Sequence, residues 1–246
     1  MLVRRSSEQG ITTLTLDSPH NRNALSARLV GELHDAFAEA AADSGVRAVL
    51  LTHTGNTFCA GADLSEAGSD ASAPLGLVRL MRAVVELPKP VVAVVDGHVR
   101  AGGLGLLGAC DIAVAGEKSS FAFTEARLGL APAVISMVLL PRLDPRAASR
   151  YFLTGERFGA REAAGMGLIT LAGEPGDVLG PVLDGLRRGS PQGLAESKRL
   201  VTAELLRVLD RDTEELAARS ARLFASEEAH EGMTAFLERR DPAWAR

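Results

Sequence analysis

Short hydrophobic segments predict the strands of the first half of the chain. Residues Ile11–Leu16 alternate apolar and polar side chains, which predicts a strand with one buried face. Three largely apolar runs, Ala48–Leu51, Val91–Val95 and Asp111–Ala115, predict strands that are covered on both faces. Helical patterns separate these runs, so we expect an α/β architecture built from right-handed crossovers.

Helical spacing is clearest after Ser26 and after Pro191. Ser26 is a good N-cap for a helix whose apolar face holds Leu29, Val30, Leu33, Phe37 and Ala41. Pro191 opens a mostly helical tail, in which helices are predicted over Leu194–Leu209 and Thr213–Ala225. We therefore predict a core over residues 1–190 and a helical region over residues 191–246. The spacing leaves open whether the tail packs on its own core or on a neighbouring subunit.

Composition and charge narrow the functional classes. The chain has 246 residues, 46% hydrophobic residues and a formal net charge of −4, which is typical of a globular protein without a general attraction for nucleic acid or anionic membranes. The first residues lack the apolar run of a signal peptide, and no stretch reaches the ~18 apolar residues of a membrane span. The two cysteines, Cys59 and Cys110, fit buried thiols. A cytoplasmic protein without nucleic-acid or membrane partners is expected.

Two glycine-containing stretches suggest a backbone anion site. Phe58–Leu64 and Arg100–Leu106 are each expected to follow a buried strand and to open a helix. Free N–H groups at such positions are suited to binding the negative oxygen that develops on a thioester carbonyl. The alternative is that these glycines only permit tight turns and close packing.

These stretches belong to a longer series of motifs that resembles the crotonase (enoyl-CoA hydratase/isomerase) superfamily. The series runs in order through nearly the whole chain. Its segments are Asn21–Ser26, Thr57–Leu64, Lys89–Gly97, Ala101–Gly103, Ala109–Ala113, Phe121–Pro132 and Glu231–Arg240. The resemblance implies a spiral of repeated ββα units with a helical C-terminal region that assembles a homotrimer or a dimer of trimers.

The resemblance also implies a coenzyme A thioester substrate and its binding residues. The two oxyanion donors map to the N–H groups of Ala62 and Gly102. Coenzyme A contacts map to Arg22, Ala24, Ala60, Asp63, Leu64 and Ser65, and Arg239 maps to a basic residue that reaches a neighbour's coenzyme A. No cofactor beyond the coenzyme A moiety is expected. The histidines lack metal-ligand spacing, so no metal is expected either.

The acid–base residues depart from the pattern of many hydratases. Glu125 matches one of two family glutamates, whereas Gly105 stands where the other is found. In this respect the chain resembles single-glutamate members such as methylglutaconyl-CoA hydratase-like proteins. Hydration of a 2-enoyl-CoA is therefore our first expectation. Isomerisation of a 3-enoyl-CoA, which needs only one base, and a catalytically silent acyl-CoA-binding protein are the alternatives.

Several other residues carry expectations that a structure can test. Asp63 is expected to interact with a helix start, and Asp111 is expected to form structural hydrogen bonds. Residues Ser65–Arg82 are expected to form a mobile flap beside the acyl pocket. Replacing Gly105 by glutamate is expected to supply a second carboxylate if the pocket has room for it.

Overall fold

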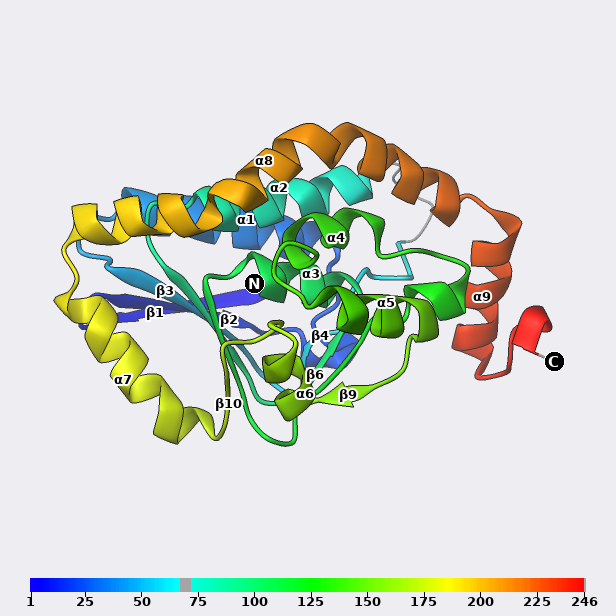
Figure 1. The fold of residues 1–246 in the computed structure, drawn as a ribbon, viewed down its shortest axis with the longest axis horizontal. Coiled ribbons are helices and arrows are strands. Elements are labelled where there is room, and N and C mark those ends of the chain that lie inside the picture. The colour runs from blue at the N-terminus through cyan, green and yellow to red at the C-terminus, as the bar shows by residue number, and fades with distance from the viewer. Residues whose placement is uncertain (67–71, 246) are drawn as a thin grey trace.

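The computed structural model describes residues 1–66 and 72–245 and has the spiral expected from the sequence (Figure 1). Successive turns of the spiral place one strand in a larger sheet and the next strand in a smaller one. The larger sheet has the order β1 (Val3–Glu8), β2 (Ile11–Leu16), β3 (Ala48–His53), β5 (Val91–Val95), β7 (Ile112–Ala115) and β10 (Leu171–Ala172). The smaller sheet has the order β4 (Thr57–Cys59), β6 (His98–Arg100), β8 (Ser120–Ala122) and β9 (Phe158–Gly159).

Helices cover both faces of the larger sheet. The α-helices are α1 (Ala27–Ala42), α2 (Ala73–Glu86), α3 (Gly102–Ala109), α4 (Ala133–Leu139), α5 (Pro145–Thr154), α6 (Ala160–Gly165), α7 (Pro175–Arg188), α8 (Pro191–Phe224) and α9 (Glu227–Glu238). The 3-10 turns are η1 (Pro19–Asn21), η2 (Glu125–Leu128) and η3 (Ala243–Ala245). In Figure 1, α1, α2 and α8 form a layer on one side of the sheet, and α7 lies on the other side. Among the described helices, none is long and apolar enough to cross a membrane.

Several sequence predictions are confirmed in detail. The predicted strands Ile11–Leu16 and Val91–Val95 have the observed bounds. The Ser26 side chain accepts a hydrogen bond from the Leu29 N–H at the start of α1, as expected for an N-cap. The very short strands β4, β6 and β8 were missed, since three residues carry too little periodicity to be distinguished from a loop.

The helical tail packs on its own core. The predicted break between two tail helices is wrong, because α8 runs continuously from Pro191 to Phe224 across α2 and α4. The buried Lys198 ammonium fixes α8 to the core, donating to Asp111 Oδ2 at 2.8 Å and to the Val84 carbonyl at 2.8 Å. Asp111 Oδ2 also accepts from the Val91 N–H at 2.7 Å, which confirms its structural role.

Two local expectations around the first glycine stretch need correction. The segment after β4 forms turns rather than a helix, and α2 begins only at Ala73. Residues 73–82 of the expected flap belong to this helix, which buries Val78, Leu80 and Met81 in the core. The flap prediction for that part is therefore wrong, and its residues 67–71 lie outside the described part of the chain.

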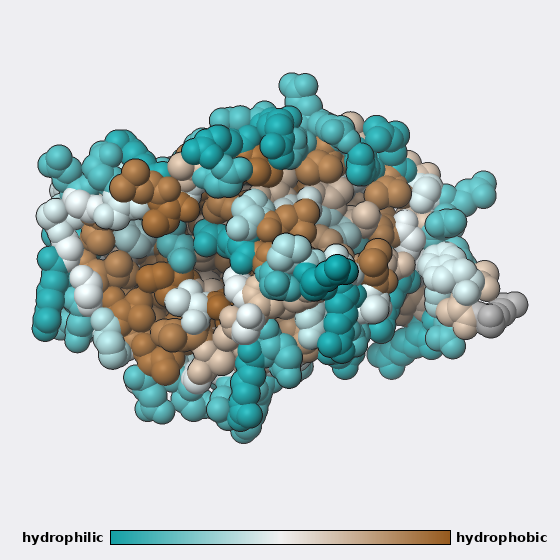
Figure 2. Space-filling model, viewed as in Figure 1, coloured by the Kyte–Doolittle hydropathy of each residue, from teal (hydrophilic) through white to brown (hydrophobic). Residues whose placement is uncertain are grey.

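Apolar side chains also gather on the face between α7 and the start of α8 (Figure 2). They extend a small buried cluster made of Ile11, Ala48, Val92 and Leu186. The partly buried residues packed against this cluster are Leu50, Ile112, Leu179, Val182, Leu183 and Leu194. This face is separate from the candidate functional site described below.

Candidate functional site

The carboxyl end of the smaller sheet brings the predicted site segments together. Strands β4, β6 and β8 are parallel neighbours, so the chain leaves all three at the same edge. β4 leads into Ala60–Ala62, β6 leads into Ala101 and Gly102, and β8 leads to Glu125. The Ala101 N–H donates to the Ala122 carbonyl at 3.2 Å and links the last two of these exits.

The two predicted donors lie where the segment after β4 comes close to the segment after β6. A Cβ added to Gly102 would lie 3.7 Å from the Ala62 nitrogen, and one added to Gly61 would lie 3.2 Å from the Gly102 nitrogen. Ala101 has φ 45° and ψ −122°, an unusual backbone conformation for a residue with a Cβ. This conformation turns the chain abruptly from β6 into α3, with Gly102 as the first helical residue.

The Ala62 and Gly102 N–H groups are free to bind a ligand. Within the described part of the chain, neither N–H donates to a protein acceptor. Gly102 is at the N-terminus of α3, where the first N–H groups lack intrahelical partners. The ends of the Leu25 and Leu77 side chains lie 3.3 Å from the Gly102 Cβ position and provide apolar walls.

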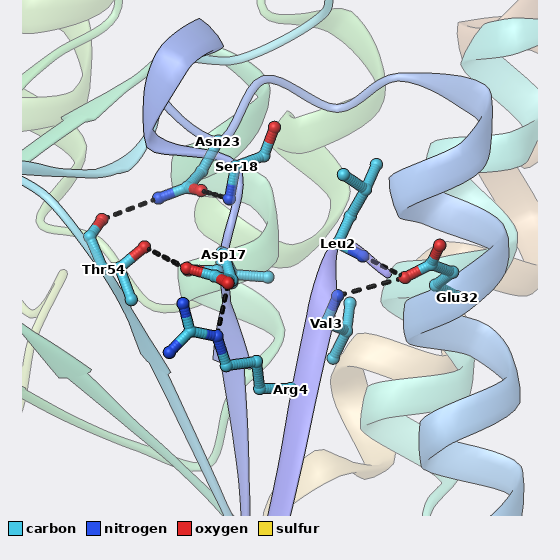
Figure 3. Close-up of polar contacts among 9 residues, drawn as sticks. Leu2, Val3, Arg4, Asp17, Ser18, Asn23, Glu32 and Thr54 are labelled. Carbon is cyan, nitrogen blue, oxygen red and sulfur yellow. Dashed lines mark hydrogen bonds and ion pairs between the residues drawn. The ribbon is translucent and has the colours of Figure 1, made fainter.

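Hydrogen bonds hold residues 21–25 against the segment that follows β4. Asn23 is fully buried, and its side-chain oxygen accepts from the Ser18 N–H at 2.7 Å while its amide donates to the Thr54 carbonyl at 3.1 Å (Figure 3). The same amide donates to the Thr57 carbonyl at 2.8 Å. The sequence motif included Asn23, but its anchoring role was missed. Its left-handed conformation, φ 52°, is one that asparagine tolerates well.

The structure groups most of the predicted coenzyme A residues. The Ala60 N–H donates to the Arg22 carbonyl at 3.1 Å, and the Leu25 N–H donates to the Gly61 carbonyl at 2.8 Å. Segment 21–25, with Arg22 and Ala24, therefore lies along segment 60–62. The next residues, Asp63, Leu64 and Ser65, continue from it in a turn.

Asp63 differs from the expectation in its local contacts, whereas the predicted contact of Arg239 with a neighbouring subunit's coenzyme A stays a prediction. Asp63 stabilises a turn rather than a helix start, because its carboxylate accepts from the Ser65 N–H at 3.0 Å and from the Ser65 hydroxyl at 2.7 Å. These hydrogen bonds hold the pKa of Asp63 below its ordinary value. Arg239 belongs to another part of the fold, where it ends α9 with an exposed side chain.

Glu125 has the properties of a proton-transferring carboxyl group. It is the first residue of η2 and is 8% exposed. Among the described residues, its Oε2 atom has no hydrogen-bond partner. Burial disfavours the charged carboxylate and raises the pKa of Glu125 to about 7. The carboxyl group is therefore suited to accepting and releasing a proton near neutral pH.

The position of the missing glutamate is filled by apolar groups. A Cβ added to Gly105 would lie 2.4 Å from Cγ2 of Ile135 and 2.9 Å from the Met81 sulfur. Real Cβ atoms essentially never approach other atoms this closely. The expectation that Gly105→Glu supplies a second carboxylate therefore fails on steric grounds, because Ile135 and Met81 leave no room for it.

Other candidate nucleophiles and ligands do not form a second site. The Cys59 thiol is fully buried, and burial raises its pKa to about 12, which suppresses the reactive thiolate. His98 is exposed and its Nδ1 lies 2.9 Å from the Ser120 hydroxyl on β8. In the described ranges, no group of three or more His, Cys, Asp or Glu residues is arranged to hold a metal ion.

Comparisons with known proteins identify the family to which the chain belongs. The family model described as Enoyl-CoA hydratase/isomerase matches residues 6–246. The chain is 32% identical to a 2,3-dehydroadipyl-CoA hydratase of Escherichia coli over 253 residues, covering 96% of each chain. It is 31% identical to a 1,2-epoxyphenylacetyl-CoA isomerase of the same organism, with 96% of this chain and 95% of the relative covered.

A solved structure adds closer similarity. An enoyl-CoA hydratase from Mycobacterium avium is 55% identical, with a TM-score of 0.94 and coverage of 99% of this chain and 98% of that chain. The chain therefore belongs to the enoyl-CoA hydratase/isomerase family and is an enzyme of that family, with the crotonase fold.

Proposed function

We propose that this enzyme hydrates a 2-enoyl-CoA through an enolate whose oxygen is bound by the Ala62 and Gly102 N–H groups. The observation that carries this proposal is the pairing of two backbone donors with a buried Glu125 at one edge of the smaller sheet. Among the described residues, neither donor has an acceptor and the Oε2 atom of Glu125 has no hydrogen-bond partner. The names of the M. avium and E. coli hydratases support hydration as the net reaction.

Each group has a definite role in the proposed reaction. The thioester oxygen accepts hydrogen bonds from Ala62 and Gly102, and these bonds strengthen as negative charge develops on it. One such donor contributes about 3–4 kcal/mol to transition-state stabilisation. Glu125, as carboxylate, removes a proton from water while the oxygen adds to the β-carbon, and it then delivers that proton to the α-carbon. A carboxyl pKa of about 7 suits both steps.

Isomerisation of a 3-enoyl-CoA to a 2-enoyl-CoA is the second candidate. A specific observation favours it, because Ile135 and Met81 occupy the space of a second carboxylate that would help to position water. Moving a double bond needs one base that removes a proton at the α-carbon and returns it at the γ-carbon. Glu125 alone is sufficient for such a transfer, and one relative in the comparison is named as an isomerase.

Binding of the coenzyme A moiety is assigned to the paired segments 21–25 and 60–65. Arg22 is exposed on this edge and is suited to contact a phosphate, and the backbone of Ala60 and its neighbours borders the donor pair. We further propose a homotrimer or dimer of trimers, in which Arg239 of one subunit reaches the coenzyme A of another. The exposed Phe236 and Leu237 on α9 support an additional subunit contact.

A substrate panel tests this function. Purified enzyme is incubated with 2-enoyl-CoA and 3-enoyl-CoA thioesters of several chain lengths in deuterated water, and products are identified by mass spectrometry. Hydration gives a mass gain of one water, whereas isomerisation leaves the mass unchanged apart from deuterium. Absence of turnover and of exchange on every thioester, with coenzyme A still bound, would support a silent acyl-CoA-binding protein instead.

A further inference from the structure

The turn that carries Glu125 is hydrogen-bonded to the two residues that follow it. Gly129 closes η2 in the left-handed conformation, φ 70°, and its N–H donates to the Glu125 carbonyl. The Leu130 N–H donates to the same carbonyl at 3.0 Å. A displacement of Gly129 or Leu130 is therefore transmitted to the backbone that bears the Glu125 side chain.

Helix α9, from the other end of the chain, lies directly on this turn. A Cβ added to Gly129 would lie 2.6 Å from the carbonyl carbon of Glu228, and one added to Gly232 would lie 2.5 Å from the carbonyl carbon of Leu128. Both glycines are thus required for a backbone-to-backbone contact between α9 and η2. Ala229 is fully buried on the same helix between these two contacts.

The turn is also held from a second side. Arg127 Nε donates to the Thr154 carbonyl at 3.0 Å, at the end of α5. Gly155 follows immediately, and a Cβ there would lie 3.0 Å from Arg127 Nε. Because η2 lies between α9 and the end of α5, the turn cannot yield to a displaced α9 without loss of the Arg127 contact.

We propose that α9 is a positioning element for the acid–base step, holding the η2 turn and through it the Glu125 carboxyl group. This proposal rests on the proposed role of Glu125. Burial is the leading cause of the raised pKa of that carboxyl, so a turn that opens to water lowers the pKa. Of the other charged side chains on η2 and α9, Arg127, Glu227, Glu228 and Glu238 are exposed, and Glu231 is half-buried in an ion pair with Arg240.

The test variant is Gly232→Ala, which adds a methyl group where α9 meets Leu128. We expect kcat for exchange of substrate protons to fall by about 10-fold to about 100-fold, as for a displacement of about 1 Å at a reacting group, with a smaller change in KM. The pH midpoint of kcat is expected to move below that of the unmodified enzyme. Gly185→Ala is the matched control, since its added methyl group on α7 has nothing within 4 Å, and it should leave both quantities unchanged.

Comparison with Glu125→Gln distinguishes failure of the proposed role of Glu125 from failure of the proposed positioning role of α9. Undiminished exchange in Glu125→Gln would overturn the proposed role of Glu125 itself. If that variant loses exchange while Gly232→Ala keeps the kcat and pH midpoint of the unmodified enzyme, only the positioning role of α9 is overturned. Lower thermal stability with an unchanged pH midpoint would likewise show a merely structural contact. Should Gly232→Ala fail to fold, Ala235→Val perturbs another buried position of α9 and is read in the same way.

Discussion

Gly105 and Ile135 are complementary in shape: Cγ2 of Ile135 would be only 2.4 Å from a Cβ on Gly105. The glycine on α3 leaves a gap, and the isoleucine on α4 fills it. Apolar side chains are therefore closely packed around position 105. A glutamate at position 105 and the isoleucine at position 135 cannot occupy this space together.

This complementarity predicts a non-additive pair of substitutions. Gly105→Glu alone should destabilise the protein by about 1–3 kcal/mol or more, because a side chain is forced into a packed core and a carboxyl group is buried there. Adding Ile135→Gly removes the nearer of the two clashing side chains and leaves the Met81 sulfur, so the double variant should recover part of the stability that Gly105→Glu loses. The measurement is the midpoint of urea unfolding together with hydration of crotonyl-CoA.

The single variant Ile135→Gly is the control for this cycle. It creates a cavity without supplying an acid, so it should lose stability and gain no hydration. If the double variant hydrates crotonyl-CoA faster than Ile135→Gly, the vacated space can hold a functional second carboxylate. Gly105→Glu that is as stable as the unmodified protein would contradict the packing described here.

Two substitutions of Gly102 distinguish the effect of losing its N–H donor from the effect of filling the space around it. Gly102→Pro removes the N–H. Proline is compatible with the first position of α3 but strains the preceding Ala101, whose φ of 45° and ψ of −122° lie outside the range preferred before proline. Loss of one oxyanion donor should reduce kcat by about 10²-fold to about 10³-fold. Gly102→Ala retains the N–H and adds a methyl group 3.3 Å from the ends of Leu25 and Leu77, so it should lose much less activity.

Measurement of kcat for the two Gly102 variants, after circular dichroism has shown that both are folded, checks this prediction. Equal losses in Gly102→Pro and Gly102→Ala would mean that bulk, rather than the missing donor, causes the defect. An active Gly102→Pro enzyme would contradict the assignment of this N–H to the oxyanion site.

Sequence patterns identified those parts of the fold whose signals are local. The alternation in Ile11–Leu16, the apolar run Val91–Val95 and the Ser26 cap depend on neighbouring residues, and all three agree with the structure. The flap prediction failed because small residues before Ala73 obscured the amphipathic helix α2 that begins there. The break predicted between Leu209 and Thr213 failed because packing on α2 and α4 supports α8 through that point.

The candidate site was predictable only in part for the same reason. Motif order predicted Ala62, Gly102 and Glu125 as candidate site residues, whereas the contacts around them join distant segments of the chain. Ile135 fills the space at Gly105, and it lies on a different helix. The burial that raises the Glu125 pKa likewise depends on the complete fold rather than on neighbouring residues in the sequence.

The exposed apolar residues of α9 predict subunit association. Phe236 and Leu237 are 56% and 66% exposed, which is unfavourable for adjacent large apolar side chains in water. Light scattering should give a mass of about three or six times the 25.8 kDa chain. Replacing both residues by serine should shift the protein toward monomer. Leu153→Ser should not, because Leu153 on α5 is 79% exposed but has, in the described part of the chain, no adjacent exposed large apolar residue. A fully active monomer would exclude both the assembly and a contribution of Arg239 to another subunit's site.

Titration of Glu125 predicts how stability changes with pH. The folded-state pKa of about 7 lies above the ordinary value of 4.5, so the folded protein holds this proton more tightly than the unfolded chain does. The stabilisation from the protonated carboxyl group is complete below about pH 4.5 and is lost as pH rises through about 7. The difference between these pKa values corresponds to about 3 kcal/mol.

Glu125→Gln keeps the shape of the side chain but cannot ionise. The variant therefore does not lose this stability as the pH rises. Its free energy of unfolding, relative to the unmodified protein, should increase by about 3 kcal/mol between about pH 4.5 and pH 8. Urea unfolding of both proteins at the same protein concentration measures this difference under equal conditions for subunit association. Glu156→Gln gives a control of opposite sign, because the hydrogen bond from Arg150 holds the pKa of Glu156 below its ordinary value. Its relative stability should decline as pH rises, and a pH-independent difference for Glu125→Gln would show that this carboxyl group titrates near its ordinary pKa.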